Sequence, residues 1–153
     1  MGFGSTGTTK VKVIKIGNPT DVDLQYSING SYLSSYTIGK EIELRDGEYI
    51  SFKNLDTFFS ESSSDYYQFV IEGTGTVELT GKLQSLINYS TTIPDYAFYH
   101  LFTDCTKITN GQNSEIKGNV IGANSCEGMF KGCTSMTDAP IFYPASLSTE
   151  TCK

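Results

Sequence analysis

Residues 101–109 read Leu-Phe-Thr-Asp-Cys-Thr-Lys-Ile-Thr, and residues 129–137 read Met-Phe-Lys-Gly-Cys-Thr-Ser-Met-Thr, so one pattern returns after 28 positions. A third copy begins at Leu147, where Cys152 follows Cys126 by 26 positions. A recurrence of this length is typical of a solenoid protein, in which each copy stacks on its neighbour. The C-terminal half is therefore expected to be a stack of similar layers.

Each copy carries apolar residues at the spacing i, i+3, i+4 and i+7, which is one stripe of an amphipathic helix. Pro94 stands at the expected start of the first helix. Proline is tolerated at the first helical position, because the N–H group that it lacks has no partner in the helix there. Each copy is predicted to form a helix, a turn and a short strand, and such a unit must stack to bury its apolar side. The predicted repeat core is Phe98, Leu101, Phe102, Cys105, Cys126, Met129, Phe130 and Cys133.

The second copy, residues 126–140, reads Cys-Glu-Gly-Met-Phe-Lys-Gly-Cys-Thr-Ser-Met-Thr-Asp-Ala-Pro. This run resembles the BspA-type leucine-rich repeats, whose copies contain Met-Phe after a Cys and then Gly-Cys-Thr-Ser-Leu-Thr and Ala-Pro. The first copy departs from this pattern, with Phe98 for the leading Cys and no Ala-Pro. The resemblance implies a repeat solenoid and a binding role without catalysis. Such repeats occur in surface proteins of gut bacteria and protists and in virion proteins of phages that infect those bacteria.

The N-terminal half has the alternating pattern of half-buried strands. Asn29-Gly30 and Asp46-Gly47 are hairpin-turn signals between such strands. About seven short strands at this spacing predict an immunoglobulin-like antiparallel β-sandwich over residues 10–80. Residues 1–9 are rich in Gly, Ser and Thr and are expected to be a flexible arm, either disordered or ordered by a partner.

The expected fold class is a β-rich α+β protein, in which the sandwich is followed by the start of a BspA-type leucine-rich-repeat solenoid over residues 81–153. The copies lie near 93–109 and 121–140, with an incomplete copy from 147. About three copies are needed for a stable stack. We therefore expect that residues beyond 153 or another subunit cover the last copy.

The composition argues against two classes of partner. The formal net charge is −6, and residues 1–80 hold six Lys and Arg against eleven Asp and Glu. Without a basic stripe we expect no nucleic-acid binding. No apolar run approaches the ~18 residues that cross a bilayer, and the start lacks a signal-peptide pattern, so no membrane insertion is expected.

The four cysteines could form a disulfide, a metal site or a reduced core. Cys126 and Cys133 lie seven residues apart on the predicted helix, about 10 Å along its axis. A disulfide needs Cα atoms within about 7 Å. No Cys-x-x-Cys pair is present and His100 is the only histidine, so we expect buried thiols and neither a metal nor a cofactor.

No residue pattern indicates catalysis, and we expect a protein that is not an enzyme. His100 could serve as a base, but no Ser or Cys stands in a nucleophile motif, so a structural role is favoured. The carboxylate pairs Asp21/Asp23 and Glu41/Glu43 are expected on a solvated strand face, with a weak Ca²⁺ contact as the alternative.

Residues 56–67 combine Ser with aromatic residues, as antibody loops do. This segment is either a binding loop or a sandwich loop whose aromatic side chains turn inward. The candidate binding residues are Phe58, Phe59, Tyr66 and Tyr67.

Taken with the resemblance, these features predict a non-catalytic structural and binding protein. The favoured hypothesis is a phage virion component, such as a head fibre, a capsid decoration or a tail-associated protein, that presents the repeats for attachment. The alternative is a module of a bacterial cell-surface adhesin. The expected partners are other protein subunits in an oligomer or virion, and a host-surface protein or glycan.

Overall fold

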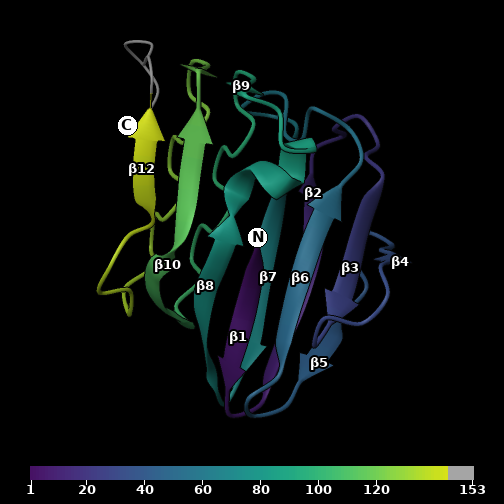
Figure 1. Ribbon diagram of the computed structural model, residues 1–153, viewed down its shortest axis with the longest axis vertical. Helices are drawn as coiled ribbons and strands as arrows, with labels where there is room; N and C mark the ends of the chain where they lie inside the picture. Colours follow the sequence, from purple (N-terminus) through teal and green to yellow (C-terminus); the bar gives the residue numbers. More distant parts are fainter. Residues whose placement is uncertain (145–153) are drawn as a thin grey trace.

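The computed structural model describes residues 1–144, which form mainly strands and turns (Figure 1). The large sheet has seven strands in the order β12, β10, β8, β1, β6, β3, β4. β10 runs parallel to both of its neighbours, whereas β1 runs antiparallel to β6 and β8. The bounds are β1 Gly2–Thr6, β3 Leu24–Ile28, β4 Ser34–Ser35, β6 Tyr49–Asn54, β8 Thr76–Lys82, β10 Ile108–Gly118 and β12 Ile141–Pro144.

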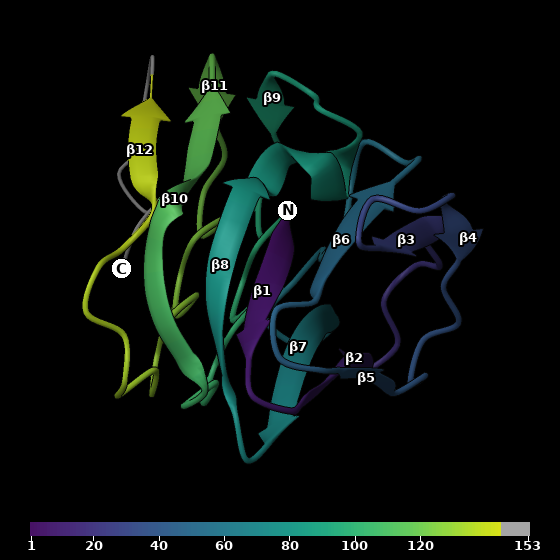
Figure 2. The same ribbon diagram turned by 60° about the horizontal axis from the view of Figure 1, so that its bottom comes forward.

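A three-stranded sheet, in the order β5, β2, β7, packs against the large sheet (Figure 2). The rings of Phe3 in β1 and Phe52 in β6 lie 5.3 and 5.1 Å from the ring of Phe69 in β7. Two sheets that share a core in this way are consistent with a β-sandwich. The bounds of the smaller sheet are β2 Thr9–Ile16, β5 Ile42–Leu44 and β7 Tyr66–Gly73.

The expected flexible arm at residues 1–9 is wrong, because β1 lies in the middle of the large sheet between β6 and β8. The side chain of Phe3 is fully buried. A Cβ atom at Gly2 would lie 2.3 Å from the carbonyl oxygen of Ile50, so the small residues here allow close strand packing. The Gly-rich composition reflects this packing rather than disorder.

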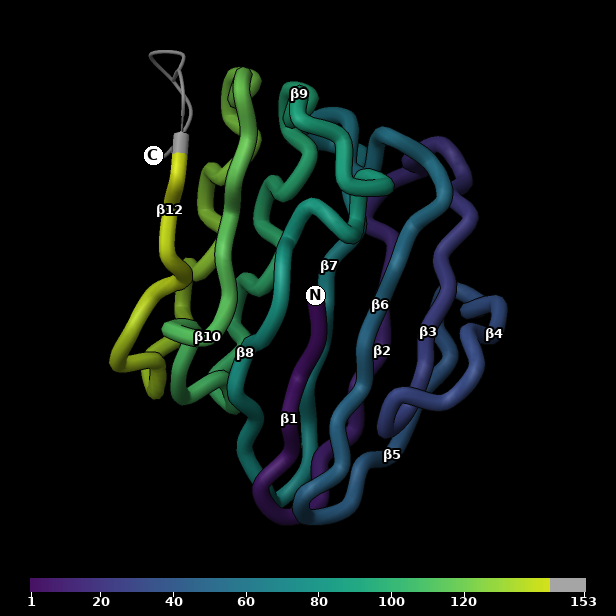
Figure 3. The backbone as a smooth tube through the Cα atoms, in the orientation of Figure 1, coloured from purple at the N-terminus to yellow at the C-terminus, as the bar shows by residue number. Residues whose placement is uncertain are grey.

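The expected repeat helices are also wrong, because residues 95–104 and 123–132 form consecutive turns (Figure 3). We call them the first and second turn segments. Left-handed backbone recurs every fourth residue, so no α-helix can continue. The only helical element within residues 1–144 is the 3₁₀ helix η1, Leu83–Ile87. The left-handed residues are Tyr96, His100 and Asp104 in the first segment, and Asn124, Gly128 and Gly132 in the second.

The two turn segments stack directly on each other. Every second N–H of the first segment donates to the carbonyl group 27 positions further on, as Phe102 does to Met129 at 2.9 Å. The rings of Phe102 and Phe130 are stacked, with centroids 5.4 Å apart and planes at 16°. The 28-residue recurrence in the sequence is therefore the spacing of two layers in space.

The sandwich and the layers share one sheet and one core. β8 crosses the boundary expected at residue 80 and pairs with β10. The N–H of Phe69 in β7 donates to the carbonyl of Leu101 at 2.9 Å, and the Phe69 and Phe102 rings stack at 5.6 Å. The sheets themselves do not form a solenoid, although β9, Thr92–Ile93, and β11, Val120–Ile121, add a small parallel pair. The third copy from Leu147 lies outside the described residues.

Candidate binding site

A polar groove runs along β8 and β10 on the outer face of the large sheet. In β10 the side chains alternate, so that Ile116 is buried whereas Glu115 is half-buried and Lys117 exposed. The register with β8 shifts between Asn110 and Asn113, and such a bulge redirects side chains. As a result both Gln112 and Asn113 are exposed at one end of the groove.

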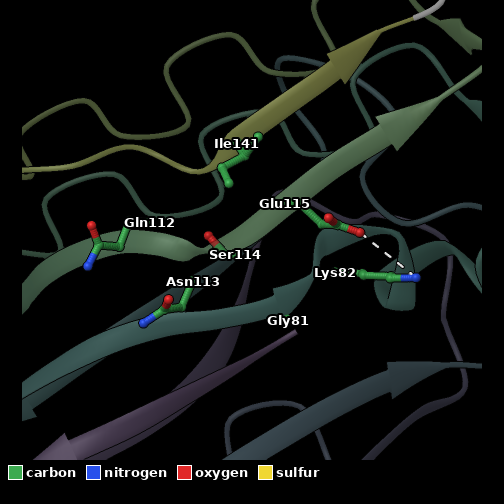
Figure 4. Close-up of a pocket in the computed structure, with 7 residues that line it drawn as sticks. All are labelled: Gly81, Lys82, Gln112, Asn113, Ser114, Glu115 and Ile141. Atoms are coloured by element: carbon green, nitrogen blue, oxygen red, sulfur yellow. Dashed lines mark ion pairs between the residues drawn. The ribbon is translucent and has the colours of Figure 1, made fainter.

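The first part of the groove is a hollow of about 280 Å³ around the ion pair of Lys82 and Glu115 (Figure 4). These two residues are register neighbours in β8 and β10, and Lys82 Nζ lies 3.8 Å from Glu115 Oε1. Ile141 of β12 is the register neighbour of Glu115 on the other side. The lining residues are Gly81, Lys82, Gln112, Asn113, Ser114, Glu115 and Ile141.

The second part is a hollow of about 210 Å³ that shares Lys82 and Glu115 with the first. The Tyr89 side chain, which is 53% exposed, lies at its edge. Tyr89 is placed there by left-handed backbone after η1, and its N–H donates to the carbonyl of Gln84 at 2.8 Å. Lys53 Nζ lies 5.9 Å from the centroid of the Tyr89 ring, a cation–π contact that restrains the ring. The other lining residues are Gln84, Ser90, Thr91, Lys117, Gly118 and Asn119.

Gln84, whose side chain lines this hollow, carries an unpaired acceptor. The residue is 5% exposed, and its Oε1 atom has no hydrogen-bond partner within residues 1–144. Leaving a buried polar atom unpaired costs about 1–3 kcal/mol of stability. Gln84 lies within η1, between Leu83 and Ser85, and both of these neighbours are buried.

Two of the four candidate binding residues lie in the core, which corrects the expectation for them. Phe59 and Tyr67 are fully buried, with ring centroids 4.9 Å apart. The Tyr67 hydroxyl donates to the carbonyl of Thr20 at 2.8 Å, and burial raises its pKa to about 12. For Phe59 and Tyr67, the aromatic side chains therefore turn inward, as the second of the two hypotheses for this segment expected. Phe58 is 36% exposed and Tyr66 is half-buried, so these two can reach a partner.

Tyr66 belongs to a surface cluster that the sequence did not predict. Its ring lies 5.1 Å from that of Tyr99 and 5.8 Å from that of His100, and Tyr96 lies 5.5 Å from Tyr99. Burial lowers the pKa of His100, and nearby Lys131 lowers it further. The sequence did contain a signal for this cluster, because Tyr96, Tyr99 and His100 flank the buried residues 97 and 98 in the first turn segment. The edge-to-face contacts of Tyr99 with Tyr66 and Tyr96 make the cluster a brace between β7 and the first turn segment.

The repeat core lies between the layers and the large sheet. Phe98, Leu101, Phe102 and Cys105 are buried, as are Cys126 and Met129, whereas Phe130 and Cys133 are half-buried. Cys105 and Cys133 are free thiols, and Cys152 lies outside the described residues. Burial raises the pKa of Cys105 to about 12 and that of Cys133 to about 11. The two thiols donate to the carbonyl groups of Phe69 and Phe102.

The second turn segment has an end face that points away from the first segment. This face resembles the face of the first segment on which the second segment stacks. The N–H groups of Gly128, Phe130 and Gly132 make no hydrogen bond within residues 1–144, whereas their equivalents one layer earlier all bond to the second segment. A hollow of about 270 Å³ on this face is lined by Phe130, Cys133 and Met136, among others. This end face is therefore suited to receive a further layer.

Over the described range, no group of three or more His, Cys, Asp and Glu side chains could hold a metal ion. Nor does that range contain a helix long and apolar enough to cross a membrane. Asp21 forms an ion pair with Lys15 at 2.7 Å, and that hydrogen bond lowers the pKa of its carboxyl group.

The groove was missed in the sequence because its residues come together only when β8 pairs with β10. Within η1, Leu83, Leu86 and Ile87 are fully buried. The amide of Gln84 within that apolar run was the available signal. Comparisons with protein-family models, with curated proteins and with solved structures found no match.

Proposed function

We propose that this chain is a non-catalytic structural and binding protein of a phage particle, as a head fibre, capsid decoration or tail-associated protein. The proposal assigns the turn layers to the BspA-type leucine-rich repeats and the two sheets to an immunoglobulin-like sandwich. Its task is to present the layers and the adjoining face of the large sheet for attachment.

The observation that carries the proposal is the layer-on-layer pairing of the two turn segments. The pairing uses backbone groups at every second residue together with the stacked rings of Phe102 and Phe130. Because backbone hydrogen bonds depend little on side-chain identity, such layers can be added while surface residues vary. This architecture suits a display protein, whose outer surface must change with its target.

The proposed protein partner is a subunit that places a layer of the same kind on the end face. Such a layer offers carbonyl groups to the N–H groups of Gly128, Phe130 and Gly132 and an apolar ring to Phe130. It thereby covers the hollow beside Met136.

Immunogold electron microscopy tests the proposal. An antibody raised against the recombinant chain is applied to purified phage particles and to the cells of the culture that encodes the chain. Gold at a fixed position on the particles is the expected result, and antibody pre-absorbed with the recombinant chain is the control. Gold confined to the cell envelope would instead establish the adhesin alternative, and label on neither would overturn both.

A further inference from the structure

We propose that the groove along β8 and β10 binds a neutral oligosaccharide, an inference that rests on the proposed attachment function and names its ligand class. The groove lies on the outer face of a seven-stranded sheet, whose paired strands hold its lining side chains in fixed positions. A preformed site of this kind needs little ordering on binding.

The most specific polar group of the groove belongs to Gln84. Gln84 Oε1 is buried, lacks a hydrogen-bond partner across residues 1–144, and belongs to a residue that lines the second hollow. A ligand hydroxyl or amide group that reaches the Gln84 carboxamide can supply the missing donor, as a bound water can. Buried polar groups are normally paired, so the missing donor is the most specific feature of the groove.

The remaining lining of the groove is mostly polar. Carboxamide side chains at Gln84, Gln112 and Asn113 both donate and accept hydrogen bonds, as sugar hydroxyl groups do. The charges are mixed, with Lys82 paired to Glu115 and Lys117 next along β10. A phosphate or polyanion would meet the Glu115 carboxylate, which disfavours it. A ligand that is polar and uncharged fits both observations.

An exposed ring lies at the edge of the groove. Tyr89 is held by its backbone hydrogen bond to Gln84 and by the Lys53 ammonium group. A tyrosine presents a rigid apolar surface with a polar tip, and this pairs with the apolar C–H face of a pyranose while hydroxyl groups point sideways. The Tyr89 ring and the Gln84 side chain line the same hollow, so a single sugar unit can contact both residues.

The length of the groove favours an oligosaccharide over a single sugar. The hollows meet at Lys82 and Glu115, and the lining extends along β10 from Gln112 to Gly118. Seven residues of strand cover about 20 Å. This is room for several linked sugar units, and a peptide would find few apolar side chains there apart from Tyr89 and Ile141.

The test uses the full chain on an array of neutral and acidic glycans, followed by NMR titration with each free oligosaccharide that binds. The expected result is binding of one or more neutral oligosaccharides. We expect Tyr89→Ala to weaken that binding about tenfold or more and Gln84→Met about fivefold or more. Tyr32→Ala is the matched control, because Tyr32 is 95% exposed and does not line the groove. Thermal unfolding of each variant checks that its fold is retained.

The inference would be overturned by no neutral saccharide binding at millimolar concentration, by binding of acidic glycans alone, or by saccharide binding that Tyr89→Ala and Gln84→Met leave unchanged. A peptide library that binds through Tyr89 in place of glycans would also overturn it. Gold labelling of particles remains a separate readout. Labelled particles without glycan binding would leave the attachment function standing and remove only the sugar.

Discussion

At the scale of the residue, the Gln84 carboxamide holds a buried oxygen without a hydrogen-bond partner among residues 1–144, which lowers the stability of the fold. We predict that Gln84→Met raises the free energy of unfolding by about 1 kcal/mol, because an apolar side chain of similar volume removes the unpaired acceptor. Urea denaturation measures the change. Gln68→Met is the matched control and is expected to lower the stability, because Gln68 Nε2 donates to the carbonyl of Thr103 at 2.8 Å. A loss of stability in Gln84→Met would show that Oε1 has a partner after all.

The cysteine thiols give a second prediction at this scale. Burial holds the pKa of Cys105 at about 12 and that of Cys133 at about 11, so both are protonated at pH 8. Because the thiolate is the reacting form, iodoacetamide should label both cysteines far more slowly in the native protein than in urea. Mass spectrometry of peptides from quenched samples follows each site. Labelling of Cys133 at the rate of an unfolded cysteine would contradict the packing of the second layer.

At the scale of the element, the approach of the second layer to the first depends on a glycine. A Cβ atom at Gly122 would lie 2.5 Å from the backbone nitrogen of Asp95 and 2.7 Å from the carbonyl carbon of Pro94. We predict that Gly122→Ala destabilises the protein by about 1–3 kcal/mol, because the layers must separate. Gly4→Ala is the control, since nothing lies within 4 Å of a Cβ atom there. Equal unfolding midpoints for the two variants would refute the close contact.

The elements also show what the sequence could and could not predict. The 28-residue recurrence predicted which residues stack, and Phe102 does lie on Phe130. The prediction of helices was wrong because two conformations fit the same apolar pattern. Over eight positions, consecutive four-residue turns and an α-helix of 3.6 residues per turn both bring the apolar residues to one side. Only the left-handed backbone at positions such as His100 distinguishes the turns from a helix. The sequence does not reveal this conformation there, because the residues are not glycine. The groove depends on long-range strand register, which no local pattern contains.

At the scale of the whole molecule, the aromatic core runs without interruption from the sandwich into the layers. Successive rings of Tyr36, Phe52, Phe69, Phe102 and Phe130 lie 5.1 to 5.6 Å apart. The sequence predicted a domain boundary at residue 80, because the alternating apolar pattern of the strands gives way there to the 28-residue recurrence. The pairing of β8 with β10 joins the parts, and it becomes apparent only when the sheet is assembled.

A fragment experiment tests this unity. We predict that residues 10–80 alone fail to fold, because the fragment lacks β1 from the centre of the large sheet and Phe102 from the face of Phe69. Circular dichroism and amide dispersion in NMR spectra measure the outcome, with the full chain as the control. A cooperative thermal transition in the fragment would show that the sandwich is an independent domain.

The central claim is that the repeated segments are stacked layers joined through their backbones. Scalar coupling across a hydrogen bond, detected by NMR between an amide nitrogen and the carbonyl carbon that accepts from it, tests this directly. We expect coupling from the amide of Phe102 to the carbonyl of Met129, 27 positions away. Coupling from Phe102 to the carbonyl of Phe98 would instead establish an α-helix and contradict the layers.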